Sequence, residues 1–221
     1  MTARTRLFAA TGLVAAVLAL GGCKTKGDIV VDEGVGITAV RGACPAVGVP
    51  DYTGDITLFR TPGATDAASI DVTAAMTNVR PVCDNGGTGE KVVSQVGFDV
   101  LARRTDTHGA RTVQLPYFVT VLRGGKAVIS KRVGTVAISF ADGQDRAQAH
   151  ASGTAYIDRA EATLSPQIRA RITRKRKAGG EDAAIDPLAQ PDVRAAVARA
   201  TFEVLVGFQL DQTQLAYNAT R

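Results

Sequence analysis

Apolar and polar residues alternate with a period of two along most of the chain between Asp55 and Ile157. Because successive side chains of a strand point to opposite faces of its sheet, this alternation predicts half-buried antiparallel strands. Six such runs follow one another, and their regular spacing is typical of a β-sandwich or a small barrel. The runs are residues 55–59, 70–77, 95–103, 113–121, 127–140 and 144–157.

Turn residues separate these runs. Residues 84–89 predict a hairpin loop between the second and third runs, and residues 106–109 predict the next turn. The sequence Arg123-Gly124-Gly125-Lys126 predicts the clearest hairpin, because adjacent glycines adopt positive φ without steric cost. Residues 142–143 turn the chain into the last run. Pro116 lacks a ladder donor, so we expect it at a sheet edge or a bulge.

The period becomes helical after the last run. Ser165 followed by Pro166 predicts the start of a helix over residues 166–178, which Gly179 ends. A second helix is predicted over residues 190–208, because its apolar residues are spaced by four, three and four. These residues are Val193, Val197, Ala200 and Val204.

Strands followed by helices indicate an α+β arrangement. Asp211 is expected to cap one last helical turn through Leu215 and Tyr217. We therefore expect an antiparallel β-sandwich, immunoglobulin-like or similar, of about six to seven strands, followed by two to three C-terminal helices. The sandwich is assigned to residues 37–160, and the helical region packed on it to residues 161–221.

One face of the last strand carries only small residues, and this face has two interpretations. It can leave a shallow groove open for an extended ligand or a partner peptide. It can instead receive the C-terminal helix, because alanine and glycine allow close backbone approach; this packing is the expectation. The residues are Ala147, Ala149, Ala151, Gly153 and Ala155.

The first residues are predicted to form an export signal. Arg4 and Arg6 precede an apolar run over residues 7–19, which is short for a membrane span of about 20 residues. The run leads into Leu20-Gly21-Gly22-Cys23, which resembles the lipobox of bacterial lipoproteins. The resemblance implies cleavage of residues 1–22, lipidation of the Cys23 thiol with acyl chains such as palmitate, and a tether over residues 23–36. Two or three acyl chains hold a protein on a bilayer without a transmembrane helix.

The same resemblance bears on location. Lys24 follows Cys23, where an acidic residue commonly marks retention in the inner membrane of lipoproteins. We therefore expect the periplasmic face of the outer membrane, with the inner membrane and the cell surface as alternatives.

Two of the three cysteines remain once Cys23 is lipidated. An even pair in an oxidising compartment indicates a disulfide between Cys44 and Cys83. Free or reactive thiols are the alternative, although neither cysteine has a C-x-x-C neighbour.

A run of cations within residues 169–177 is the sharpest binding signal. Such a helix can grip acidic headgroups, lipopolysaccharide phosphates or cell-wall carboxylates, with each cation adding about 1 kcal/mol near an anionic surface. A solvated helical face with its cations at the negative end of the helix dipole is the alternative. The run contains Arg169, Arg171, Arg174, Lys175, Arg176 and Lys177.

Other chemistry has little support. His108 and His150 lack partners at metal-ligand spacing, so neither a metal site nor a cofactor is expected. No nucleophile motif or phosphate-binding glycine loop is present. The net charge of +5 is too small to argue for nucleic acid.

These observations favour a non-catalytic, lipid-anchored envelope protein with a structural or protein-binding role and an envelope protein as partner. Two alternatives stay open: a module that binds anionic surfaces through residues 169–177, and an enzyme whose site is assembled from loops.

Overall fold

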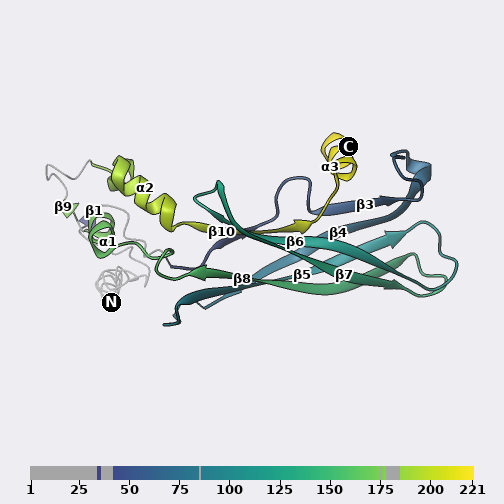
Figure 1. Ribbon diagram of the computed structural model, residues 1–221, viewed down its shortest axis with the longest axis horizontal. Helices are drawn as coiled ribbons and strands as arrows, with labels where there is room; N and C mark the ends of the chain where they lie inside the picture. The colour runs from purple at the N-terminus through teal and green to yellow at the C-terminus, as the bar shows by residue number, and fades with distance from the viewer. Residues whose placement is uncertain (1–33, 36–41, 85, 175, 178–184) are drawn as a thin grey trace, which may run out of the picture. The chain divides into compact units, whose positions relative to one another are not determined.

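The computed structural model describes residues 34–35, 42–84, 86–174, 176–177 and 185–221. Apart from the two-residue strand β1 (Gly34–Val35), every element below belongs to the unit formed by residues 35–221. Two four-stranded sheets make up most of it (Figure 1). One has the order β3 (Asp55–Phe59), β4 (Ile70–Cys83), β5 (Lys91–Arg104), β8 (Arg146–Asp158). The other has the order β2 (Ala46–Gly48), β10 (Phe202–Phe208), β6 (Arg111–Arg123), β7 (Ala127–Phe140).

The helices follow the long strands in sequence. They are α1 (Pro166–Thr173), α2 (Pro191–Ala200) and α3 (Gln212–Thr220). Two short 3₁₀ helices, η1 (Ala67–Ser69) and η2 (Pro187–Ala189), and the two-residue strand β9 (Arg176–Lys177) complete the set. The chain is therefore α+β and mainly antiparallel; β2 and β10 pair in parallel.

All six strands predicted from the alternation are present, as β3 to β8. The hairpin predicted at residues 84–89 joins the paired strands β4 and β5. Gly124 and Gly125 have φ of +60° and +71° between β6 and β7, which confirms the second hairpin. Because β3, β4 and β5 stay consecutive in one sheet, the strand order differs from the ABED and CFG sheets of immunoglobulin domains.

The inner faces of the two sheets share one hydrophobic core. In β5, buried and more exposed residues alternate from Val92 to Arg104, as a strand with one covered face requires. Each fully buried valine or phenylalanine contributes about 1.5–3 kcal/mol. The most deeply buried apolar residues include Val72, Val96, Phe98, Val100, Leu115, Ile138, Val204 and Phe208.

The helix predicted over residues 190–208 is wrong in its second half. Helix α2 ends at Ala200, and residues 202–208 form β10 between β2 and β6. An interior strand covered on both faces has a nearly continuous apolar run, and the sequence FEVLVGF has this pattern. Val204 continues the helical spacing of Val193 and Val197 only by coincidence. The sheets thus take a strand from the region that the sequence assigned to helices.

The small face of β8 packs against the opposite sheet, so the expectation that the C-terminal helix covers it is wrong. A Cβ added at Gly153 would lie 2.4 Å from Cγ2 of Val119 on β6. Ala155 is buried, and Ala147, Ala149 and Ala151 contact the core. The small side chains of β8 therefore allow the two sheets to approach each other closely around Gly153 and Val119.

Pro116 lies in β6, an interior strand, but at a local edge. Its partner strand β10 ends at Phe208, which pairs with Tyr117. The next residue, Gln209, donates its N–H to the Pro116 carbonyl at 2.9 Å. Because β10 has ended at this point, no backbone hydrogen bond between β6 and β10 requires an N–H from Pro116.

The predicted caps are correct. The Ser165 hydroxyl accepts from the Ile168 N–H at the start of α1, and Asp211 forms a capping box with Gln214 at the start of α3. Helix α1 is shorter than predicted, because Arg174 is extended. The glycines expected to end it, at residues 179–180, lie outside the described residues.

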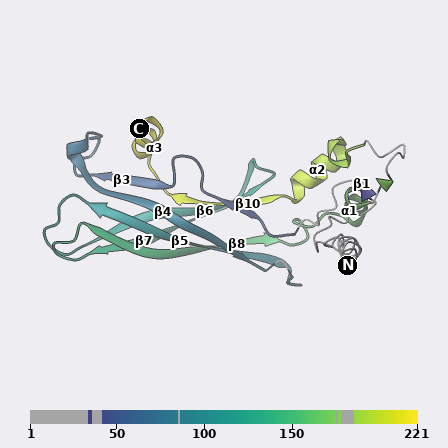
Figure 2. The same ribbon diagram turned by 180° about the vertical axis from the view of Figure 1, so that it is seen from behind.

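Helix α3 lies beside β3, as both views show (Figures 1 and 2). Tyr217 packs edge-on against Phe59, with ring centroids 5.1 Å apart. The buried Asn218 amide donates to the carbonyls of Tyr52 and Asp55, each at 2.8 Å. Helix α3 therefore packs against β3, the edge strand of this sheet.

The Cys44–Cys83 disulfide is present, with Cα atoms 6.0 Å apart. It joins the segment before β2, in one sheet, to the end of β4, in the other. The pairing predicted from the cysteine count is therefore confirmed.

Arg104 is a buried cation that the sequence reasoning did not identify. It is 1% exposed at the end of β5, where the chain crosses between sheets. Its guanidinium donates to the carbonyls of Gln144, Gly109, Thr107 and Ala141 at 2.7–2.9 Å, and lies 5.3 Å from the ring centroid of Phe140. One side chain thus fastens the β5–β6 and β7–β8 connections together.

Candidate functional site

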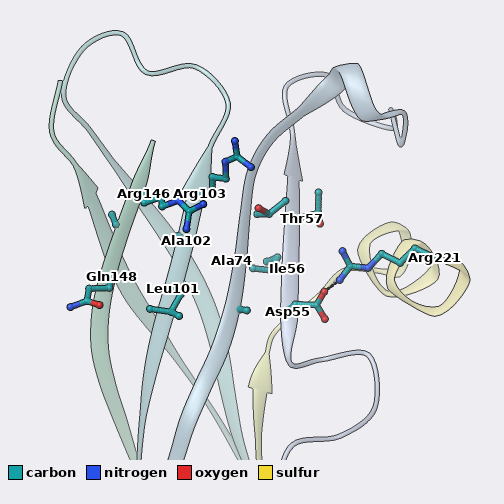
Figure 3. A pocket seen from close by; sticks show the side chains of 13 residues that line it. Asp55, Ile56, Thr57, Ala74, Leu101, Ala102, Arg103, Arg146, Gln148 and Arg221 are labelled. Carbon is teal, nitrogen blue, oxygen red and sulfur yellow. Dashed lines mark ion pairs between the residues drawn. The ribbon is translucent and has the colours of Figure 1, made fainter. Parts of the chain in front are cut away.

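A groove of about 590 Å³ lies on the outer face of the sheet β3-β4-β5-β8 (Figure 3). Thr73 and Ala75 of β4 contribute small side chains to its floor. Leu101, which is 48% exposed, stands on the neighbouring strand β5. The remaining lining residues are Asp55, Ile56, Thr57, Ala74, Ala102, Arg103, Arg146, Ala147, Gln148 and Arg221.

The groove follows from side-chain size on neighbouring strands. Ala75 on β4 is directly opposite Leu101 on β5, which in turn is opposite Gln148 on β8. On the other side, Arg221 follows α3 and pairs with Asp55 of β3 (Figure 3). The small outward residues Thr73 and Ala75 between two bulkier borders therefore leave a depression over this part of β4.

Two arginines face each other at one end of the groove. Arg103 and Arg146 are direct cross-strand partners, an arrangement that is destabilising for like charges. They share one carboxylate oxygen of Asp145, at 3.4 Å and 3.8 Å. Their side chains are 67% and 79% exposed, so these ion pairs add little stability. The two guanidiniums are thus available to hydrogen-bond an incoming carboxylate or phosphate.

A hydrogen-bonded network adjoins the groove on the same face. Asp99 accepts from His150 Nδ1 at 3.0 Å and from the Asn78 amide at 2.7 Å, and Arg80 donates to Asn78 at 2.6 Å. The bond from His150 and then that from Asn78 hold the pKa of Asp99 below its usual range. Because folding lowers the pKa of Asp99, the ionised carboxylate stabilises the fold at pH values above the usual aspartate pKa, and this stabilisation is lost as the pH falls to the lowered pKa.

The two histidines lie where the sequence placed them. His150 is exposed on β8, with its ring 3.3 Å from the position of a Cβ on Gly97. His108 lies in the turn after β5 and contacts Asp106 at 2.8 Å. Within residues 42–84, 86–174 and 185–221, no group of three or more His, Cys, Asp or Glu side chains is placed to hold a metal ion.

The structure does not put the six predicted cations on one helix. Arg169 and Arg171 belong to α1, Arg174 ends it, and Arg176 and Lys177 form β9. Lys175 lies outside the described residues. Arg171 is committed to Asp192 and Gln190. The predicted single basic helix over residues 166–178 is therefore wrong.

Arg169 instead lines a second cavity of about 610 Å³, together with Arg159, Ile172 and Phe202. This cavity also contacts Gly42 and Cys44, at the start of the described segment that leads into β2. Arg159 uses its Nε to donate to the Gly89 carbonyl at 2.6 Å. The cavity lies at the end of the two sheets opposite to Arg103 and Arg146, a strand length away along β5 and β8.

The described helices are all too short or too polar to cross a bilayer. The apolar run over residues 7–19 and Cys23 lie outside the described residues. Comparison of the chain with protein-family models, with curated proteins and with solved structures finds no match in any of the three.

Proposed function

We propose that this chain is a lipid-anchored protein of the bacterial cell envelope that acts by binding rather than by catalysis. The observation that carries the proposal is the Cys44–Cys83 disulfide. It uses two of the three cysteines and leaves Cys23, at the end of the lipobox-like sequence, as the third. The proposed location is the periplasmic face of the outer membrane, with Lys24 after the anchor.

The proposal assigns the outer-face groove to an extended segment of an envelope protein. The depression crosses the four strands of the sheet and has small floor residues, one exposed leucine and charged borders, so that it can receive the side chains of a short partner segment. The two sheets are proposed to form a β-sandwich with its own strand order. Binding through residues 169–177 is not favoured, because Arg171 already pairs with Asp192.

The anchor is tested by replacing Cys23 with serine. The unaltered protein is expected to lose residues 1–22 and to gain the mass of its acyl chains, and the Cys23→Ser protein to gain none. Flotation with membranes should fall by at least tenfold, because about 0.8 kcal/mol is lost for each CH₂ withdrawn from the bilayer. The measurements are the intact mass of the protein and its flotation with membranes. A Cys23→Ser protein that floats as well as the parent contradicts the anchor.

The groove is tested with a photocrosslinking residue at Leu101 in living cells. A protein adduct is expected from this position and not from Val82, which is 70% exposed near the other end of β4. Ala75→Arg should abolish the Leu101 adduct by filling the groove, whereas Val82→Arg should leave it unchanged. Equal adducts from both positions, or an adduct that survives Ala75→Arg, speak against the groove.

A further inference from the structure

The first half of β7 is exposed on both of its faces. Every residue from 127 to 133 is exposed, whereas Val136, Ile138 and Phe140 in the second half are buried in alternation. The exposed half still pairs with β6 through the hairpin. Large aliphatic side chains stand on it: Val128 is 63%, Ile129 49% and Val133 60% exposed. Three exposed aliphatic side chains within six residues of one edge strand make this half of β7 a candidate contact surface.

The charge of this strand has one sign. Residues 123–133 contain four cations and neither aspartate nor glutamate. Arg123 is committed to Glu161 at 3.4 Å and to the Arg199 carbonyl at 2.7 Å. In the described part of the chain, no carboxylate lies within ion-pair distance of the other three cations. These are Lys126, Lys131 and Arg132.

Two of these cations lie over aromatic rings. The Lys131 ammonium is 5.1 Å from the centroid of Phe118, and the Arg132 guanidinium is 5.4 Å from that of Tyr156. Tyr156 is 49% exposed. Aliphatic, aromatic and cationic groups therefore mix along this edge strand on its two faces, the composition that favours the boundary between acyl chains and headgroups.

This half of β7 lies at the same end of the two sheets as Gly42, where the described segment that leads into β2 begins. The Gly124 N–H, at the hairpin tip, donates to the Thr201 carbonyl at 2.9 Å. Thr201 and Gly42 line the same cavity. From Lys91 to Arg104, β5 spans about 40 Å at roughly 3.3 Å per residue, which separates this end from the arginine end of the groove.

From these observations we infer that residues 126–133 dock on the anionic lipid surface of the bilayer that holds the anchor. The inference rests on the proposed lipid anchor, and it adds the surface that orients the two sheets. Val128, Ile129 and Val133 enter the interface along this edge of the sheet, from its two faces. Lys126, Lys131 and Arg132, which have no carboxylate partner, neutralise headgroup phosphates. The groove then faces away from the membrane, toward its partner.

Pairing of β7 with a second copy of the chain is the main competing use of this strand. An exposed edge strand is a template for another strand. Two copies, however, would bring together two strands that each carry three cations and no carboxylate over residues 126–133, so their charges repel. The charge thus favours an anionic surface over a second copy.

The test uses the full acylated protein in vesicles of phosphatidylcholine with or without phosphatidylglycerol. A polarity-sensitive probe is attached at Val128→Cys, and at Leu101→Cys in the groove as the control. Headgroup-depth brominated lipid is expected to quench the probe at residue 128 several-fold more than at 101, in the anionic vesicles only. Salt should reduce the difference, since exposed charges are screened beyond about 8 Å at physiological ionic strength.

Two double variants of equal charge change locate the surface. Lys131→Glu with Arg132→Glu should abolish the quenching at residue 128, and Arg169→Glu with Arg174→Glu should leave it in place. Circular dichroism melting checks that each variant is folded. If only the variant Arg169→Glu with Arg174→Glu loses the quenching, docking belongs to the cations of α1 and the inference is overturned.

The remaining outcomes are equally decisive. If the protein is acylated but the probe at residue 128 is quenched no more than the probe at residue 101, the docking inference is overturned and the proposed anchor stands. A covalent dimer through residue 128 under short-linker crosslinking assigns the strand to a second copy. Absence of acyl mass on Cys23 refutes the proposed anchor and the docking that rests on it.

Discussion

Arg104→Met is expected to lower the free energy of unfolding by roughly 3 kcal/mol or more. The methionine retains most of the buried volume but leaves the four carbonyls that the guanidinium now satisfies without a donor. Each buried acceptor that loses its partner costs about 1–3 kcal/mol, less where water can enter the loops. The measurement is chemical denaturation followed by circular dichroism.

The neighbouring arginine provides the matched control. Arg103 is on the same strand but on the outer face, with its side chain 67% exposed. Arg103→Met should change stability by about 0.5 kcal/mol or less. Arg104→Lys should recover only part of the loss, because one ammonium cannot reach four carbonyls that a planar guanidinium spans. Equal effects of Arg103→Met and Arg104→Met would show that Arg104 does not fasten the loops.

Removal of the Cys44–Cys83 disulfide is expected to lower the free energy of unfolding by about 4 kcal/mol, since the bridge closes a loop with a sequence separation of 39. The unfolded chain gains most from the loss, because its ends are then free to move apart. The variant is Cys44→Ser with Cys83→Ser, so that neither cysteine is left to pair wrongly. Denaturation midpoints of the parent with and without reductant provide the comparison.

Two measurements make the disulfide result interpretable. Non-reducing peptide mapping of the parent should give the linked peptides of Cys44 and Cys83. Reductant should lower the midpoint of the parent to that of the double variant and leave the double variant unchanged. A midpoint insensitive to reductant in the parent, with the linked peptides present, would contradict the expected stabilisation.

The period-two pattern was sufficient for the long strands because each of them buries one face over a large part of its length. In β5 the exposed and buried residues alternate along nearly its whole length, and the sequence shows that alternation directly. The caps at Ser165 and Asp211 were equally readable, because they are local hydrogen bonds between residues three apart. The disulfide followed from a count of cysteines.

The same reasoning failed at β10 and at the basic segment. The spacing of Val193, Val197, Ala200 and Val204 fits a helix. The chain nevertheless becomes a strand at Phe202, because residues 202–208 pair with β2 on one side and with β6 on the other. Likewise, α1 ends before Lys175, so a run of cations in sequence does not become one helical face. Pairing with distant strands determined the structure of β10, and the end of α1 at Thr173 determined that of the basic segment.

The candidate sites depend on register, which couples residues far apart in sequence. Neither the opposition of Arg103 and Arg146 nor the place of Ala75 beside Leu101 can be known until β4, β5 and β8 are paired. The exposure of residues 127–133 on both faces is likewise invisible in their sequence, which has the same apolar content as a covered strand. The sequence by itself determined the strands with one buried face, the helix starts, the disulfide and the expected lipid anchor. The tertiary structure alone decided β10, the groove, the buried Arg104 and the bare half of β7, because each depends on which distant strand covers a residue and which leaves it open to solvent.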